Sequence, residues 1–189
     1  MGLDYTNGCV NFRDVGGFIN LIMNEEYLFE GKLLRGGSID FVEKISEIGN
    51  PKTIISLKNS PDPERFDSQY FHFPLPKKVE RYETYQKEVR LWLNQIVRVF
   101  ENPDLEFPVL IHCLSGKDRT GIVVAALLLI IGIDEKIIEE EYLLSDGDVS
   151  KESIELAISG MRNIQEYFKR IDINKVRENL RKNILIKDL

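Results

Sequence analysis

The chain is short of cysteine, since its 189 residues include only Cys9 and Cys113, which lie far apart. Two distant thiols exclude a scaffold held together by disulfides and are typical of a reducing compartment. Basic residues are also in deficit: 25 Lys and Arg stand against 31 Asp and Glu, which gives a net charge of −6. This balance argues against nucleic acid as a partner. An anionic substrate would need a local positive site.

Long apolar runs and targeting segments are missing as well. The longest apolar run, residues 122–133, is shorter than the ~20 residues that a membrane-spanning helix needs. We therefore expect a buried helix there and no transmembrane segment. Residues 1–6 lack the basic and then apolar pattern of a secretory signal peptide. These absences predict a cytoplasmic protein, and secretion by a route without a signal peptide stays open.

No internal repeat, linker or low-complexity tract divides the chain. Its length favours one domain over residues 1–189. A hydrophobic content of 43% and a charged content of 30% are typical of a globular protein with a proper core.

Hydrophobic periodicity predicts strands that alternate with helices. Short apolar or β-branched stretches indicate strands at 32–35, 53–57, 71–75 and 109–111. Helical spacing and capping signals indicate helices at 39–48 behind an N-cap at Ser38, and at 80–100, 119–131, 134–144, 151–170 and 174–186. Residues 11–19 are predicted to be extended, with a break at Gly16 and Gly17. The alternation predicts an α/β fold with a mostly parallel sheet, flanking helices and a helical C-terminal part.

Residues 112–121 carry most of the functional information and read His-Cys-Leu-Ser-Gly-Lys-Asp-Arg-Thr-Gly. A strand before them and a helix after them would put Cys113 where open α/β sheets bind ligands. Amides at a helix N-terminus favour an anion and the thiolate form of a nearby cysteine. Gly116 would let the loop curl so that its amides converge. The predicted phosphate-binding loop consists of Leu114, Ser115, Gly116, Lys117, Asp118 and Arg119.

Cys113 and Arg119 together predict a phosphatase that works through a phosphocysteine intermediate. The thiolate would attack phosphorus in line, while the planar Arg119 fork and the loop amides would hold the phosphate oxygens. Thr120 would donate its hydroxyl to the sulfur as a leaving group, and His112 would tune the thiolate by hydrogen bonding. A satisfied histidine at a strand end is the alternative for His112. Nothing in this chemistry requires a metal or another cofactor.

This segment resembles the signature loop of the cysteine-dependent tyrosine and dual-specificity phosphatases. Asn-Phe-Arg-Asp-Val-Gly-Gly at 11–17, Leu-Arg-Gly-Gly-Ser at 34–38 and Tyr-Leu-Leu-Ser at 142–145 are similar to motifs of the bacterial and fungal tyrosine phosphatase branch. The resemblance implies a three-layer phosphatase-like fold and no cofactor. Lys117 is similar to a lysine of phosphoinositide-active members. The expected partners are therefore a phosphorylated protein, a phosphoinositide or an inositol phosphate.

The general acid is less clear from the sequence. Many relatives carry an aspartate in the stretch that corresponds to 72–80, and this chain has none there. The branch resembled here carries an aspartate at the place of Asp118, so we hypothesise that Asp118 protonates the leaving group. The alternative is that Asp118 braces the loop by accepting backbone hydrogen bonds. Asp62 and Glu80 are further candidates.

Other residues of the N-terminal motifs are predicted to be structural. Arg13 and Asp14 would pair and pin the N-terminal segment near the loop, and Arg35 would give similar support. Cys9 is predicted to be a free, half-buried thiol. Whether Cys9 forms a disulfide with Cys113 depends on a distance that the sequence does not give.

Two other functions stay open. A sulfurtransferase also uses a cysteine in an anion-binding loop, but the Gly-Lys-Asp-Arg-Thr-Gly end of the loop argues against it. A catalytically weak phosphate-binding adaptor is supported only by the missing upstream aspartate. The sequence decides neither the oligomeric state nor the substrate among phosphotyrosine, phosphoserine or phosphothreonine, and a lipid or inositol phosphate.

Overall fold

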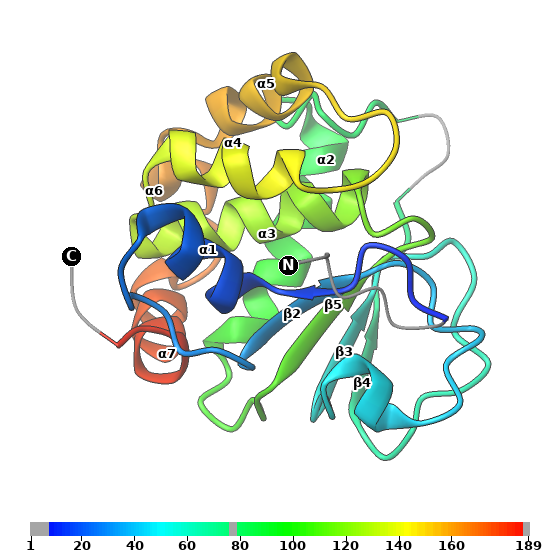
Figure 1. The fold of residues 1–189 in the computed structure, drawn as a ribbon. Helices are drawn as coiled ribbons and strands as arrows, with labels where there is room; N and C mark the ends of the chain where they lie inside the picture. Colours follow the sequence, from blue (N-terminus) through cyan, green and yellow to red (C-terminus); the bar gives the residue numbers. More distant parts are fainter. Residues whose placement is uncertain (1–7, 76–78, 187–189) are drawn as a thin grey trace.

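The computed structural model describes residues 8–75 and 79–186, and a five-stranded sheet lies at the centre of this part (Figure 1). The strand order is β1-β2-β5-β3-β4, in which β1 pairs antiparallel with β2 and the other neighbours are parallel. The strands are β1 (Arg13–Asp14), β2 (Leu33–Gly36), β3 (Thr53–Ser56), β4 (Gln69–His72) and β5 (Val109–His112). The predicted α/β fold with a mostly parallel sheet is confirmed.

Helices flank this sheet and form most of the C-terminal part, as predicted (Figure 1). The helices are α1 (Val15–Met23), α2 (Lys87–Arg98), α3 (Asp118–Ile131), α4 (Glu135–Leu143), α5 (Lys151–Met161), α6 (Ile164–Tyr167) and α7 (Ile173–Ile184), with short 3-10 helices η1 (Ile45–Ile48) and η2 (Val99–Glu101). The predicted helix at 151–170 is thus divided into α5 and α6. In the described part of the chain, no helix is long and apolar enough to cross a membrane.

Alternate side chains of the strands enter two hydrophobic cores. Val109 and Ile111 of β5 pack in the larger core, which the long helices cover. Leu110, between them, packs in a smaller core together with Ile48 of η1. Because both faces of β5 are buried, its sequence is a continuous apolar run without the alternation of a half-exposed strand. Helix α3 is buried on nearly all sides, which explains its apolar sequence.

The extended segment predicted at 11–19 is wrong beyond Asp14, because helix α1 begins directly after it. The Asp14 carboxylate accepts hydrogen bonds from the backbone N–H groups of Gly16 and Gly17 and so caps the helix. The cap and the packing outweigh the low helix propensity of the two glycines. Gly16 also permits a close contact, since a Cβ there would lie 2.5 Å from the carbonyl oxygen of Phe29.

The helix predicted at 39–48 is wrong over its first half, and only η1 at its end is helical. The chain before η1 is held by tertiary contacts. The Ser38 N–H donates to the carbonyl of Leu114 at 2.9 Å, and Lys58 forms an ion pair with Asp40. The helical end is placed as predicted, because Gly49 closes η1 in the left-handed conformation.

The helix predicted from residue 80 begins only at residue 87, as α2. Residues 79–86 form a loop because Thr84 is bound on both sides by later helices. Its hydroxyl donates to the carbonyl of Ala157 at 2.7 Å, and its carbonyl accepts from the Tyr167 hydroxyl at 2.8 Å. The strand predicted at 71–75 lies two residues earlier in the structure, at 69–72. Its position is set by the parallel pairing of β4 with β3.

Candidate active site

Cys113 follows directly after β5, the strand between β2 and β3, and is 2% exposed. Gly36, Ser56 and His112 are aligned in register at the carboxyl ends of these three parallel strands. Five residues after Cys113, helix α3 begins at Asp118. The predicted arrangement of strand, loop and helix is therefore present, with Cys113 at the carboxyl end of the central strand and a short loop leading to the α3 N-terminus.

The carbonyl groups of residues 114–117 point away from the interior of the loop, because donors outside the loop bind them. The carbonyl of Leu114 accepts from the Ser38 N–H, and that of Ser115 accepts from Asn11 Nδ2 at 2.8 Å. The next two carbonyls, of residues 116 and 117, accept from Arg35 Nη2 at 2.9 and 3.4 Å. In a trans peptide unit the N–H points opposite to the C=O. The following N–H groups therefore face the inside of the loop, where an anion would lie.

Gly116 is required by both conformation and space. Its φ is +69°, which favours glycine, and a Cβ there would lie 2.5 Å from the backbone of Gly36 and Gly37. The predicted role of Gly116 in curling the loop agrees with this geometry.

A buried group of charges supports the loop from behind. Arg13 Nε and Arg35 Nη1 donate to the two oxygens of Glu141 at 2.8 and 2.6 Å, and all three side chains are at most 1% exposed. Burial lowers the pKa of Arg35 to about 10, against the opposing effect of Glu141. Burial also disfavours the Glu141 carboxylate, but Arg35 and Arg13 outweigh it and hold the pKa of Glu141 below its ordinary value.

This arrangement corrects the predicted pairing of Arg13 with Asp14. Arg13 binds Glu141 and the Ser145 hydroxyl, whereas Asp14 caps α1. The predicted supporting role of Arg35 takes a definite form, since one guanidinium joins Glu141 to the loop carbonyls. Glu141 carries no signal of its own in the sequence, although it directly precedes the motif at 142–145.

Arg119 lies in the first turn of α3, and its guanidinium reaches the loop after β3. Nη1 donates to the carbonyl of Leu57 at 2.5 Å and to Asn59 Oδ1 at 3.2 Å. Both bonds use Nη1, so among the described contacts Nε and Nη2 stay available to an anion.

His112 lies behind the thiol in a buried polar network. Its Nε2 is 3.1 Å from Asp62 Oδ2, and both side chains are fully buried. Asp62 also accepts from Lys58 Nζ at 3.0 Å and from the Tyr70 hydroxyl at 2.8 Å. Burial alone would favour a protonated Asp62, but His112 and the other donors hold its pKa well below the ordinary range. Asp62 is therefore ionised, buried and paired, which does not fit the predicted alternative of a general acid.

Asp118 lies at the mouth of the loop, with its side chain 21% exposed. Its Oδ1 accepts from the Tyr82 hydroxyl at 2.5 Å, and its Oδ2 is 3.5 Å from Arg81 Nη1. Glu80 is exposed, and its carboxylate accepts from the N–H of Tyr82 at 3.4 Å. Residues 76–78 of the stretch that lacks an aspartate lie outside the described residues.

The other predicted site residues differ in their exposure and contacts. Lys117 Nζ donates to the carbonyl of Asp148 at 3.1 Å, in an exposed contact. Thr120 is buried, and its hydroxyl donates to the carbonyl of Gly36 at 3.5 Å. Leu114 is 63% exposed.

Cys9 is fully buried, more deeply than predicted, and its Sγ donates to the carbonyl of Gly37 at 3.6 Å. Burial raises the pKa of Cys9 to about 12, so this thiol stays protonated near neutral pH. Both cysteines are free.

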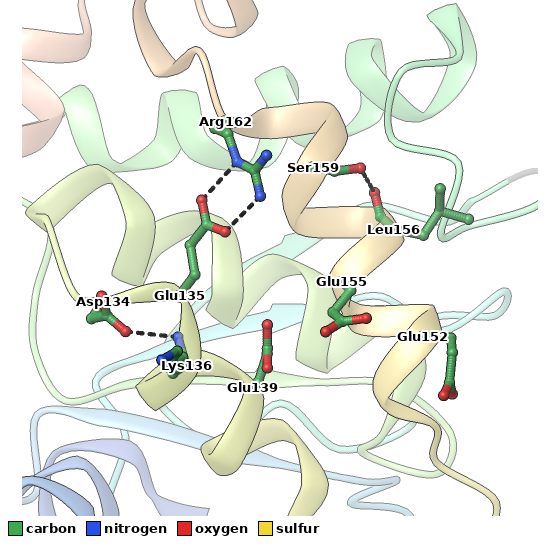
Figure 2. Close-up of a pocket in the computed structure, with 9 residues that line it drawn as sticks. All are labelled: Asp134, Glu135, Lys136, Glu139, Glu152, Glu155, Leu156, Ser159 and Arg162. Carbon is green, nitrogen blue, oxygen red and sulfur yellow. Dashed lines mark hydrogen bonds and ion pairs between the residues drawn. The ribbon is translucent and has the colours of Figure 1, made fainter.

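A hollow of about 820 Å³ lies away from the loop, between α4 and α5 (Figure 2). Its carboxylates include Glu139, Glu152 and Glu155. The guanidinium of Arg162, which lines the hollow, forms a bidentate ion pair with Glu135. This hollow has the wrong charge for a phosphate, and the loop at 113–119 is the better candidate for the anion site.

Three comparisons with known proteins found similar sequences or structures. A family model described as the tyrosine phosphatase family matches residues 5–185. A stretch of 42 residues is 52% identical to the triple specificity protein phosphatase PtpB of Mycobacterium tuberculosis, and it covers 22% of this chain and 15% of that protein.

Solved structures also match parts of this chain. DUSP15 matches with a TM-score of 0.50 and 17% identity over 76% of this chain and 93% of its own. TpbA of P. aeruginosa matches with a TM-score of 0.48 and 20% identity over 78% of this chain and 85% of its own.

Proposed function

Because this chain belongs to the tyrosine phosphatase family of cysteine-dependent enzymes, we propose that it hydrolyses phosphomonoesters through a phosphocysteine at Cys113. The observation that carries the proposal is the loop itself. Its carbonyls are bound from outside and its amides face inward around the thiol, beside the α3 N-terminus and Arg119. The family match over 5–185 also supports one phosphatase domain over residues 1–189.

In the first step, the Cys113 thiolate attacks phosphorus and an S–P bond forms as the P–O bond breaks. The leaving oxygen takes a proton from Asp118. The loop amides and Arg119 bind the three equatorial oxygens while charge spreads over them. In the second step, Asp118 accepts a proton from water, the water attacks phosphorus, and the thiolate leaves as inorganic phosphate forms.

Proteins phosphorylated on tyrosine, or on both tyrosine and serine or threonine, are the substrates we propose first. Phosphoinositides and inositol phosphates are second, because Lys117 places one more cation on the rim of the loop. The curated relative PtpB is named for triple specificity, but it is matched over a small part of its length.

The proposal is tested by phosphate release from phosphotyrosine peptides, phosphothreonine peptides, phosphoinositides and soluble inositol phosphates. We expect turnover on at least one class, inhibition by vanadate, and covalent phosphate on the Cys113 peptide after acid quenching. Phosphate binding without hydrolysis would favour the adaptor function. Transfer of sulfur from thiosulfate to cyanide without phosphate release would favour the sulfurtransferase.

Asp118→Asn tests the general acid. We expect kcat for an alkyl-like leaving group to fall by about 10²-fold, the usual lower value for general acid catalysis, and the high-pH limb of the rate profile to flatten. The control is Glu80→Gln, which removes the exposed rival carboxylate and should change neither quantity. Unchanged turnover and pH profile in Asp118→Asn would remove Asp118 from this role.

A further inference from the structure

Two tyrosines outside the signature loop form a connected pair beside Asp118. The Tyr82 hydroxyl donates to Asp118 Oδ1 at 2.5 Å and lies 2.7 Å from the Tyr142 hydroxyl. The two rings meet edge to face, with centroids 6.5 Å apart. One comes from the loop at 79–86 and the other from α4, so the Asp118 side chain is held from two separate elements.

Helix α4 fixes the inner member of the pair. Tyr142 is 1% exposed and directly follows Glu141, which the two buried arginines bind. Its ring packs against the first turn of α3 at Gly121, where a Cβ would lie 2.6 Å from the ring. The glycine that ends the signature sequence thus makes room for Tyr142 near Asp118.

The loop that carries Tyr82 is also firmly attached. Thr84, two residues further on, is fully buried and binds both Ala157 of α5 and Tyr167 of α6. Gly160 of α5 lets the threonine approach this closely, because a Cβ there would overlap the Thr84 hydroxyl. Tyr82 therefore reaches Asp118 from a fixed backbone, which lowers the entropy cost of holding the hydrogen bond.

We propose that Tyr82, supported by Tyr142, is the positioning residue of the general acid: it binds Oδ1 of Asp118 and leaves Oδ2 as the oxygen that carries the transferred proton. The inference rests on the proposed role of Asp118. In the acid form, Oδ1 is the carbonyl oxygen and accepts from Tyr82, while the proton on Oδ2 passes to the leaving oxygen. In the second step the same Oδ2 accepts the proton of the attacking water.

The two oxygens differ in the closeness of their contacts, because the Tyr82 hydroxyl lies 2.5 Å from Oδ1 whereas Arg81 Nη1 lies 3.5 Å from Oδ2. Burial and the Asp118 carboxylate raise the pKa of Tyr82 far above its ordinary value, so its hydroxyl keeps its proton and acts as a donor. Arg81 faces Oδ2, the Tyr142 hydroxyl faces Tyr82, and the charge of Arg35 acts on Tyr142. A hydrogen bond to a carboxylate favours its ionised form, so the pH profile of the reaction is a readout of the contact between Tyr82 and Asp118.

The test is Tyr82→Phe, which removes one hydroxyl and keeps the ring, compared on two aryl phosphates with a good and a poor leaving group. We expect kcat/KM for the poor leaving group to fall about tenfold, the order of one hydrogen bond to a charged group, with little change for the good one. The high-pH limb of kcat/KM should move to higher pH. The matched control is Tyr85→Phe, because that side chain is 60% exposed three residues further on.

The comparison with Asp118→Asn separates the two hypotheses. If Asp118→Asn shows no dependence on the leaving group, the acid assignment itself is wrong. If Asp118→Asn shows the dependence and Tyr82→Phe slows both substrates equally without moving the pH limb, the positioning role of Tyr82 is overturned. In the double variant we expect no further dependence on the leaving group beyond that of Asp118→Asn.

Discussion

A Cys113→Ser variant is expected to hydrolyse aryl phosphates about 10⁴-fold more slowly than the wild type, or slower still, as is usual when the nucleophile of a covalent mechanism is lost. A serine hydroxyl is a weak nucleophile without an adjacent base. The neighbouring His112 is fully buried and faces Asp62, so we do not expect it to act as that base. The contacts that hold the loop carbonyls do not involve the sulfur, so the variant should still bind a phosphopeptide, as titration calorimetry would measure.

The matched control is Cys9→Ala, which removes the other thiol. We expect its kcat to stay within about threefold of the wild type, because Cys9 packs under Gly37 and its thiol stays protonated. If Cys113→Ser kept its turnover, or if Cys9→Ala lost as much, Cys113 would not be the nucleophile.

A Glu141→Ala variant is expected to lower the free energy of unfolding by about 3–5 kcal/mol, the usual cost of removing one partner from a buried ion pair. Arg13 and Arg35 would then be two buried cations without their shared anion. Urea denaturation monitored by circular dichroism measures the change. The adjacent Glu140 is exposed, and Glu140→Ala should change stability by less than about 0.5 kcal/mol.

The pH dependence of stability gives a second check on Glu141. Its pKa is lowered in the folded state, so its contribution is present above the ordinary glutamate pKa of about 4.5 and disappears as the pH falls through the folded value. The wild type should therefore lose stability on acidification, and Glu141→Gln should lose less over the same interval. The supporting ion pair would be contradicted if the wild type and Glu141→Gln lost equal stability on acidification. It would also be contradicted if Glu141→Ala lowered the free energy of unfolding by less than about 1 kcal/mol.

The central part of the site could be predicted because its signals are local. An apolar run, the Cys-to-Arg spacing, Gly116 and a second apolar run occur within one stretch, and each has a direct structural meaning. The structure confirms the strand and the helix around Cys113. The parallel sheet followed from the same alternation of short apolar strands with helices.

What the sequence could not predict depends on contacts between distant residues. Thr84 prevents an early start of α2 because α5 and α6 bind it, and Asp14 starts a helix through glycines that have little helix propensity of their own. Glu141 and Tyr82 carry no local motif. Their roles arise only when α4 and the loop at 79–86 come to lie beside α3.

The carbonyls of residues 114–117 are bound by donors from the N-terminal part of the chain. The activity of the site therefore depends on the folding of that part as well. The donors come from Asn11, Arg35 and Ser38, up to 104 residues earlier in the sequence. An isolated piece spanning only β5 and α3 would lack all of these donors, so its amides would not converge. During refolding, the anion site would then be completed late, after the N-terminal strands have docked against β5 and the loop that follows it. Partial unfolding of the N-terminal segment would inactivate the protein before its core is lost.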